Sequence, residues 1–219
     1  MNIEEEIFKK ANILYDKLIP YGFLKEKDYY YLEKEFLNGE FKALITITKN
    51  KVIGKIIDLE TGEEYFNIRV KKEDGSFVNK VREAYKDLLL DIKNNCCEEK
   101  YFVGNQSNRI TTKIIDKYNA YPEFLWEKCP DFGIFRKPSG KWFVLIMNLD
   151  YSKITNKKGE VEVMNLKLPR EEIPNLIKKK GYYEAYHMSK KDWITIVLND
   201  SLQDEEIELL IDKSYNIVK

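Results

Sequence analysis

The sequence predicts an α+β protein in two halves of similar plan, each an antiparallel β-meander packed against flanking helices. Three observations support this class: closely spaced segments in which apolar and polar residues alternate, other segments with apolar residues at helical spacing, and a polar stretch over residues 94–108 near mid-chain. Of the 219 residues 43% are apolar, which suffices for a hydrophobic core and excludes a disordered chain.

The first half is predicted to run helix, meander, helix. Asn2 is a candidate N-cap for the first helix, three glutamates suit its first turn, and Pro20 and Gly22 end it. The turns between the strands are too short for parallel crossovers, so neighbouring strands must pair antiparallel. Helices are expected at residues 7–19 and 76–92, and strands at 29–36, 41–48, 52–59 and 65–70.

The second half repeats this plan without visible sequence repetition. Turn signals stand at residues 138–140 and 156–159, and Gly181 is a candidate C-cap. Helices are expected at residues 110–118, 171–180 and 207–217, and strands at 124–127, 133–136, 141–149, 161–168 and 193–198. The polar stretch between the halves predicts domains at 1–98 and 107–219.

The amino terminus and the apolar runs bear on location. Residues 1–6 are acidic where a signal peptide would be basic and then apolar. The longest apolar runs, such as 142–147, are only as long as a strand, so no membrane partner is expected. The three cysteines are an odd number without a secretion signal, which favours free thiols. We therefore expect a cytoplasmic protein.

Sequence motifs for catalysis are missing. Six residues separate Gly133 from Gly140 where a phosphate loop has four, and Trp142 stands where that loop needs Ser or Thr. His187 is the single histidine, so no zinc site of standard spacing can be written, and no cofactor or metal is expected. A catalytic triad of His187, a serine such as Ser189 and an acid is not supported, because the sequence contains no nucleophile-elbow or oxyanion-hole motif. A structural or phosphate-contacting histidine is favoured.

Charge is unevenly distributed although the net charge is zero. Residues 136–191 contain 13 basic and 6 acidic side chains, a balance of +7, whereas residues 192–219 contain 2 and 7, a balance of −5. Basic hairpin turns can follow a phosphate backbone. Exposed turns are commonly charged without any such role, and the charges alone favour that plainer interpretation.

A string of residues in the second half adds a resemblance. Tyr186-His187-Met188-Ser189-Lys190-Lys191-Asp192-Trp193, followed by Asn199-Asp200 and by residues 210–215, resembles the MmcQ/YjbR family. The resemblance covers roughly residues 107–218, and residues 54–59 and 81–85 resemble an upstream segment of longer members. One departure is Asp192, where the family often has a second histidine before the tryptophan.

The resemblance implies a frataxin-like or secretion-chaperone-like α+β fold and a DNA-binding role, with no catalytic residues. On that basis we predict a non-catalytic DNA-binding protein of weak, salt-sensitive affinity. Its predicted phosphate contacts are Arg136, Lys137, Lys141, His187, Lys190 and Lys191. Two alternatives stay open: a protein-interaction or chaperone-like module, supported by 15 Tyr, 11 Phe and 3 Trp, and an enzyme that uses His187.

Overall fold

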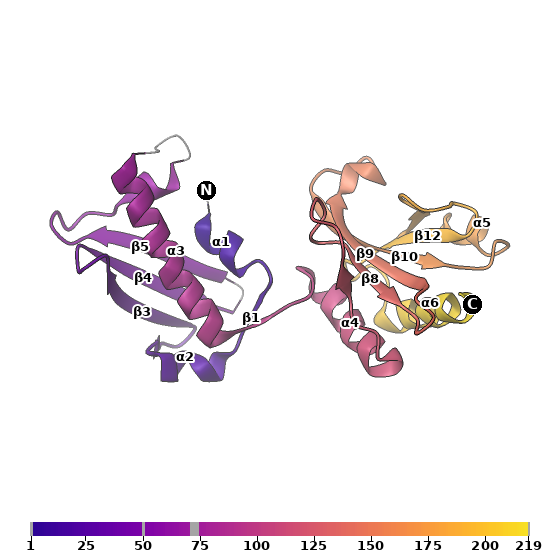
Figure 1. Cartoon of the computed structure of the whole chain (residues 1–219), viewed down its shortest axis with the longest axis horizontal. Helices are drawn as coiled ribbons and strands as arrows, with labels where there is room; N and C mark the ends of the chain where they lie inside the picture. The colour runs from indigo at the N-terminus through magenta and orange to yellow at the C-terminus, as the bar shows by residue number, and fades with distance from the viewer. Residues whose placement is uncertain (1, 50, 71–74, 219) are drawn as a thin grey trace. The chain divides into compact units, whose positions relative to one another are not determined.

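The computed structural model describes residues 2–49, 51–70 and 75–218, and it divides the chain into two compact units, Met1–Lys100 and Tyr101–Lys219. Each unit has an antiparallel sheet with helices packed on it (Figure 1). The predicted α+β class with two halves of similar plan is therefore confirmed.

The N-terminal unit is a four-stranded meander, in the order β2-β3-β4-β5, crossed by one long helix (Figure 1). A two-stranded ribbon of β1 and β6 joins the two ends of this unit. Its elements are α1 (Ile3–Phe8), β1 (Ala11–Ile13), α2 (Tyr15–Tyr21), β2 (Leu24–Lys25), β3 (Tyr29–Phe36), β4 (Phe41–Thr48), β5 (Lys51–Asp58), the 3-10 helix η1 (Phe66–Arg69), α3 (Ser76–Cys96) and β6 (Cys97–Glu99).

The meander forms because its apolar residues alternate. Phe41, Ala43, Ile45 and Ile47 of β4 are all buried, and they share a core with the apolar stripe of α3. Burial of one sheet face against one helix stripe fixes the register of the strands, since a slip of one residue would expose the whole set.

Two expectations for this unit are wrong. Residues 11–13 interrupt the single helix expected over 7–19, because they pair as a strand with Cys97–Glu99 from the far end of the unit. Residues 66–69 form a 3-10 helix where a strand was expected. The side chain of Arg69 reaches from this turn to Glu4, and its hydrogen bonds hold the segment near α1.

The acidic first turn of α1 has a second role beside helix stabilisation. Asn2 caps the helix as predicted, since its side chain accepts a hydrogen bond from the backbone N–H of Glu5. Glu4, however, is 2% exposed. Its carboxylate accepts both guanidinium arms of Arg69 at 2.9 and 2.7 Å and the hydroxyl of Tyr85 at 2.5 Å. Glu4 is thus the centre of a buried ionic cluster.

The C-terminal unit has a six-stranded antiparallel sheet in the order β11-β12-β10-β9-β8-β7. Helices α4 and α6 cover one face of it (Figure 1). Its elements are α4 (Asn105–Tyr118), β7 (Glu123–Phe124), β8 (Gly133–Arg136), β9 (Trp142–Asp150), the 3-10 helix η2 (Tyr151–Lys153), β10 (Glu160–Lys167), α5 (Ile173–Leu176), β11 (Tyr182–Glu184), β12 (Trp193–Val197) and α6 (Asp204–Ile217).

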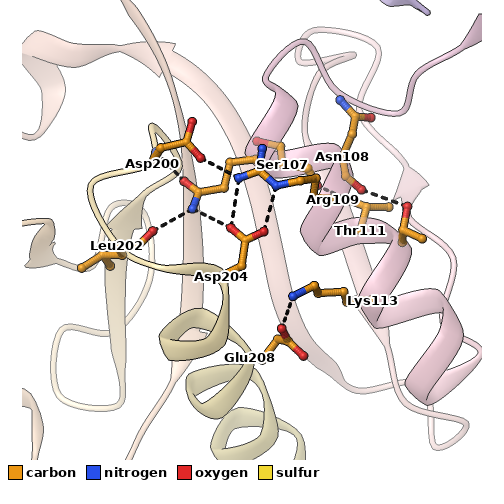
Figure 2. A network of polar contacts seen from close by, with 11 residues as sticks. Ser107, Asn108, Arg109, Thr111, Lys113, Asp200, Leu202, Asp204 and Glu208 are labelled. Carbon is orange, nitrogen blue, oxygen red and sulfur yellow. Dashed lines mark hydrogen bonds and ion pairs between the residues drawn. The ribbon is translucent and has the colours of Figure 1, made fainter.

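Ionic contacts join α4 to α6. Arg109 donates to Asp204 at 2.8 Å and to Asp200 at 2.5 Å, and Lys113 pairs with Glu208 one turn further on (Figure 2). The hydrogen bond from Arg109 holds the pKa of the Asp204 carboxyl below its ordinary value. The acidic start of α6 therefore faces basic residues of α4.

The other face of the sheet carries a second apolar cluster. Buried side chains of β8, β9, β10 and β12, among them Met147 and Val163, lie beneath partly buried Trp126, Trp142 and Tyr183. Ile154, from the segment between β9 and β10, packs on the same cluster. That segment therefore lies on this face of the sheet.

Two elements differ from the sequence expectation. The helix expected over 171–180 covers only Ile173–Leu176, because Lys178–Lys180 turn the chain toward Gly181, whose φ is +91°. Strand β11 was not predicted, since three residues are too few to show alternation. In the part of the chain that the structure describes, no helix is long and apolar enough to span a bilayer.

Candidate nucleic-acid interface

The predicted site residues lie in two loops at the same end of the strands of the C-terminal sheet. Arg136, Lys137 and Lys141 flank the turn between β8 and β9, and the other three lie between β11 and β12. The register places the start of β12 beside the end of β10, which lies beside the start of β9. The loops are thus separated by the width of β10.

Two of the cations in the first loop have partners within the unit. Arg136 donates to Glu123 at 3.2 Å and to the carbonyl of Gly140 at 3.1 Å. Lys137 donates to the carbonyls of Tyr215 and Val218 at 3.0 and 2.7 Å, and its ammonium lies 4.4 Å from the centre of the Tyr215 ring. Lys137 therefore satisfies the C-terminal carbonyls of α6.

We expect Lys137→Met to lower the free energy of unfolding of the C-terminal unit by about 1 kcal/mol. The substitution removes the donor for two carbonyls and the charge that complements the helix end. Urea denaturation followed by tryptophan fluorescence measures this, because all three tryptophans lie in the C-terminal unit. Lys141→Met at the exposed end of the same turn is the control and should leave the midpoint unchanged.

His187 occupies a defined position although its side chain is exposed. Its φ is +57°, in the left-handed region, and its ring centroid lies 4.1 Å from that of Tyr186. Asn165 and Thr195, both fully buried, hold the preceding residue. Asn165 donates to the carbonyl of Tyr186 at 2.7 Å, and the N–H of Tyr186 donates to the hydroxyl of Thr195 at 2.9 Å.

The two buried residues also bond to one another. The hydroxyl of Thr195 donates to the side-chain carbonyl of Asn165 at 2.6 Å. Both side chains belong to the face that carries the second apolar cluster, since they alternate with residues of the helix-covered core. This polar pair inside the sheet fixes the backbone from which His187 projects.

His187 and Lys190 line a pocket of about 630 Å³ that extends along β11. Another part of the lining comes from the segment between β9 and β10, including Lys153 and Asn156. Such a volume falls in the range of ligand-binding pockets. The pocket is therefore lined by the loop that contains His187 and by a hairpin that contains none of the predicted site residues.

Two groups of lysines lie on chain segments that line this pocket or adjoin its lining. The ammonium of Lys157 lies 5.3 Å from the centre of the Tyr151 ring, and burial and a hydrogen bond with Tyr151 raise the pKa of Tyr183 on β11. The lysines of these two groups, all exposed, are Lys153, Lys157, Lys158, Lys178, Lys179 and Lys180. We call these six residues the lysine cluster.

The charges at the His187 end are mixed. Lys190 pairs with Glu184, and Lys191 is exposed. Asp192, the residue that departs from the family string, accepts a hydrogen bond from Arg170 at 2.7 Å, which holds its pKa below the ordinary value. The negative charge of Asp192 is thus compensated by a neighbouring cation.

No trio of His, Cys, Asp or Glu side chains within residues 2–49, 51–70 and 75–218 is arranged to hold a metal ion. Free Cys96 is buried at the end of α3, and Cys97 and Cys129 are half-buried.

Comparison with known proteins concerns the C-terminal half. The YjbR family model matches residues 115–217. The uncharacterized protein YyaQ of Bacillus subtilis is 37% identical over 108 residues, which are 48% of this chain and 92% of YyaQ. The uncharacterized protein YbdF of Escherichia coli O157:H7 is 27% identical over 116 residues, or 53% of this chain and 88% of YbdF.

Solved structures also match about half of the chain. A crystal structure of a Pseudomonas syringae protein is 38% identical, with a TM-score of 0.49, and covers 51% of this chain and 97% of its own. A Deinococcus radiodurans protein with a DUF419 domain is 18% identical, with a TM-score of 0.37, and covers 47% and 71%.

Proposed function

This chain belongs to the YjbR family, and from that premise we propose that it is a non-catalytic DNA-binding protein whose C-terminal unit contacts phosphates along β11. One observation carries the proposal: Lys153 and Lys190 line the pocket beside β11, and the other residues of the lysine cluster adjoin its lining segments in the chain. Lysines spaced along a groove match a strand of regularly spaced phosphates.

The six predicted contacts contribute unequally to this proposal. His187 and Lys190 line the pocket, where Lys190 pairs with Glu184, and Lys191 is exposed next to Lys190. Lys141 is exposed on the neighbouring turn and can extend the surface, whereas Arg136 and Lys137 already have partners within the unit. We therefore propose that the lysine cluster supplies most of the phosphate contacts.

We expect the full chain to bind a random duplex weakly, with a plot of log affinity against log salt concentration whose slope is about −4, since about four phosphates would be neutralised. The triple variant Lys178→Glu, Lys179→Glu, Lys180→Glu should reduce the affinity at least about tenfold and make the slope shallower by about one for each phosphate that is no longer neutralised. Fluorescence anisotropy at several salt concentrations measures both quantities.

Two matched variants make this experiment specific. Lys17→Glu, Lys27→Glu, Lys80→Glu changes the net charge equally but on exposed positions of the N-terminal unit, and should leave affinity nearly unchanged. The triple variant Lys141→Glu, Lys190→Glu, Lys191→Glu tests directly the contacts that the sequence predicted in the two loops. Equal decreases in affinity for all three variants would indicate a net-charge effect, and wild-type protein that does not bind at low salt would refute the DNA-binding proposal.

A further inference from the structure

The pocket beside β11 contains features that phosphate binding alone does not require. Its lining includes the rings of Tyr183, Tyr186 and His187 together with the charged side chains of Lys153, Glu184 and Lys190. Side chains that only follow a phosphate backbone need charge and no aromatic surface. Aromatic rings flanked by cations are instead the combination with which proteins hold unpaired bases.

The rings are held in place before any ligand binds. Tyr186 packs on the apolar cluster of the sheet, and its backbone N–H and carbonyl are both bonded to the buried pair Asn165 and Thr195. His187, whose backbone is left-handed, has its ring centroid 4.1 Å from that of Tyr186, with the two ring planes tilted by 57°. A preformed ring pair has little conformational freedom left to lose on binding.

The surroundings suit a base with its phosphate. Asn156 in the lining offers an amide group that can bond to a base edge, and Lys153 and Lys190 come from two different lining segments. A base inside a duplex has both faces covered by its neighbours and cannot enter such a recess. The ligand must therefore present a base that is free of stacking.

We propose that this pocket takes up an unpaired nucleobase of single-stranded DNA, which stacks on one ring of the tilted Tyr186–His187 pair while the lysines contact the flanking phosphates. This inference rests on the proposed function and specifies its substrate. Single strands are then the preferred ligand, and duplex DNA is bound only through its backbone.

The test compares two oligomers with the same backbone: an oligothymidylate, and an abasic oligomer in which every base is replaced by hydrogen. Anisotropy with the full chain should show the base-bearing strand bound about tenfold more tightly, because stacking acts on the base alone. Both strands should show similar salt dependence, since their phosphates are the same.

Two substitutions connect the effect to the pocket. His187→Asn removes the ring while keeping a residue that tolerates the left-handed backbone, and Tyr186→Leu keeps an apolar side chain on the cluster. Each should reduce the preference for the base-bearing strand several-fold, and Tyr186→Leu should leave binding of the abasic strand unchanged, because Tyr186 is not one of the predicted phosphate contacts. Tryptophan fluorescence in urea verifies that each variant is folded.

The outcomes separate this inference from the proposed function. Equal, salt-dependent affinity for the two oligomers would overturn the base pocket and leave phosphate binding in place. A base preference that survives both substitutions would also overturn it, because the base would then bind elsewhere. Failure of both oligomers and of duplex DNA to bind at low salt would overturn the inference together with the proposed function.

Discussion

Replacing Gly54 by alanine is expected to lower the free energy of unfolding of the N-terminal unit by about 3–5 kcal/mol. A Cβ atom at this position of β5 would lie 1.7 Å from the hydroxyl oxygen of Tyr85 and 2.5 Å from a carboxylate oxygen of Glu4. Both groups are buried and bonded to one another, so neither can move without breaking the ionic cluster. The carbonyl of Gly54 also accepts a hydrogen bond from Arg69 at 2.7 Å.

The same cluster makes the unit sensitive to pH. Burial would raise the pKa of the Glu4 carboxyl, but hydrogen bonds from Arg69 and Tyr85 outweigh it and hold the pKa below the ordinary value of 4.5. A lowered pKa in the folded state stabilises the protein fully above the ordinary value, and this contribution is lost as the pH falls through the folded-state pKa. Glu4→Gln should remove that dependence.

Unfolding of the two units can be followed separately, which makes both substitutions testable in the full chain. Trp126, Trp142 and Trp193 all belong to the C-terminal unit, so tryptophan fluorescence follows that unit, while far-UV circular dichroism follows both. Gly54→Ala should shift the part of the dichroism transition that comes from the N-terminal unit to a lower urea concentration. The midpoint followed by tryptophan fluorescence should stay unchanged.

Gly75→Ala is the matched control. A Cβ there would meet only a methyl group of Val78 at 3.9 Å, so the substitution should cost less than about 1 kcal/mol. If Gly54→Ala were no less stable than Gly75→Ala, the close packing of Tyr85 and Glu4 against β5 would be wrong.

The regular part of the fold was predictable because local patterns determine it. The alternation in residues 41–48 marks β4, and the helical spacing from Ile110 to Tyr118 marks most of α4. The errors lie where distant partners decide the conformation. Residues 11–13 become a strand only because residues 97–99 pair with them, and residues 66–69 adopt a tight turn whose Arg69 bonds to Glu4.

The candidate site was partly predictable for the same reason. The family string indicated His187, Lys190 and Lys191 as site residues, and the turn signal at residues 156–159 predicted the hairpin that supplies another part of the pocket lining. This hairpin lines the same pocket as His187 and Lys190 because Ile154 packs the segment between β9 and β10 on the sheet. Strand β11, along which the pocket lies, is too short to leave a pattern in the sequence.

Glu162→Ala is expected to destabilise the C-terminal unit by about 3 kcal/mol, because the carboxylate of Glu162 accepts hydrogen bonds from backbone N–H groups that alanine cannot replace. Glu162 is 7% exposed on β10, and its two carboxylate oxygens accept the N–H groups of Val103 and Gly104 at 2.7 and 2.8 Å. These residues lead into α4, whose N-terminus favours a negative charge. Alanine would leave both donors without an acceptor in a site that water reaches poorly.

The side chain at 162 and the glycine at 104 form one close contact, so two further variants extend the test. A Cβ at Gly104 would lie 2.5 Å from the Glu162 carboxylate, and Gly104→Ala should therefore displace that carboxylate and destabilise the same unit. Glu162→Gln keeps one acceptor oxygen and should cost about half as much as alanine. Glu160→Ala, at an exposed position two residues earlier on β10, is the control. The urea midpoint followed by tryptophan fluorescence should decrease from Glu160→Ala to Glu162→Gln to Glu162→Ala. The part of the dichroism transition that comes from the N-terminal unit should stay at the same urea concentration. A Glu162→Ala midpoint equal to that of the control would mean that the carboxylate does not hold the start of α4.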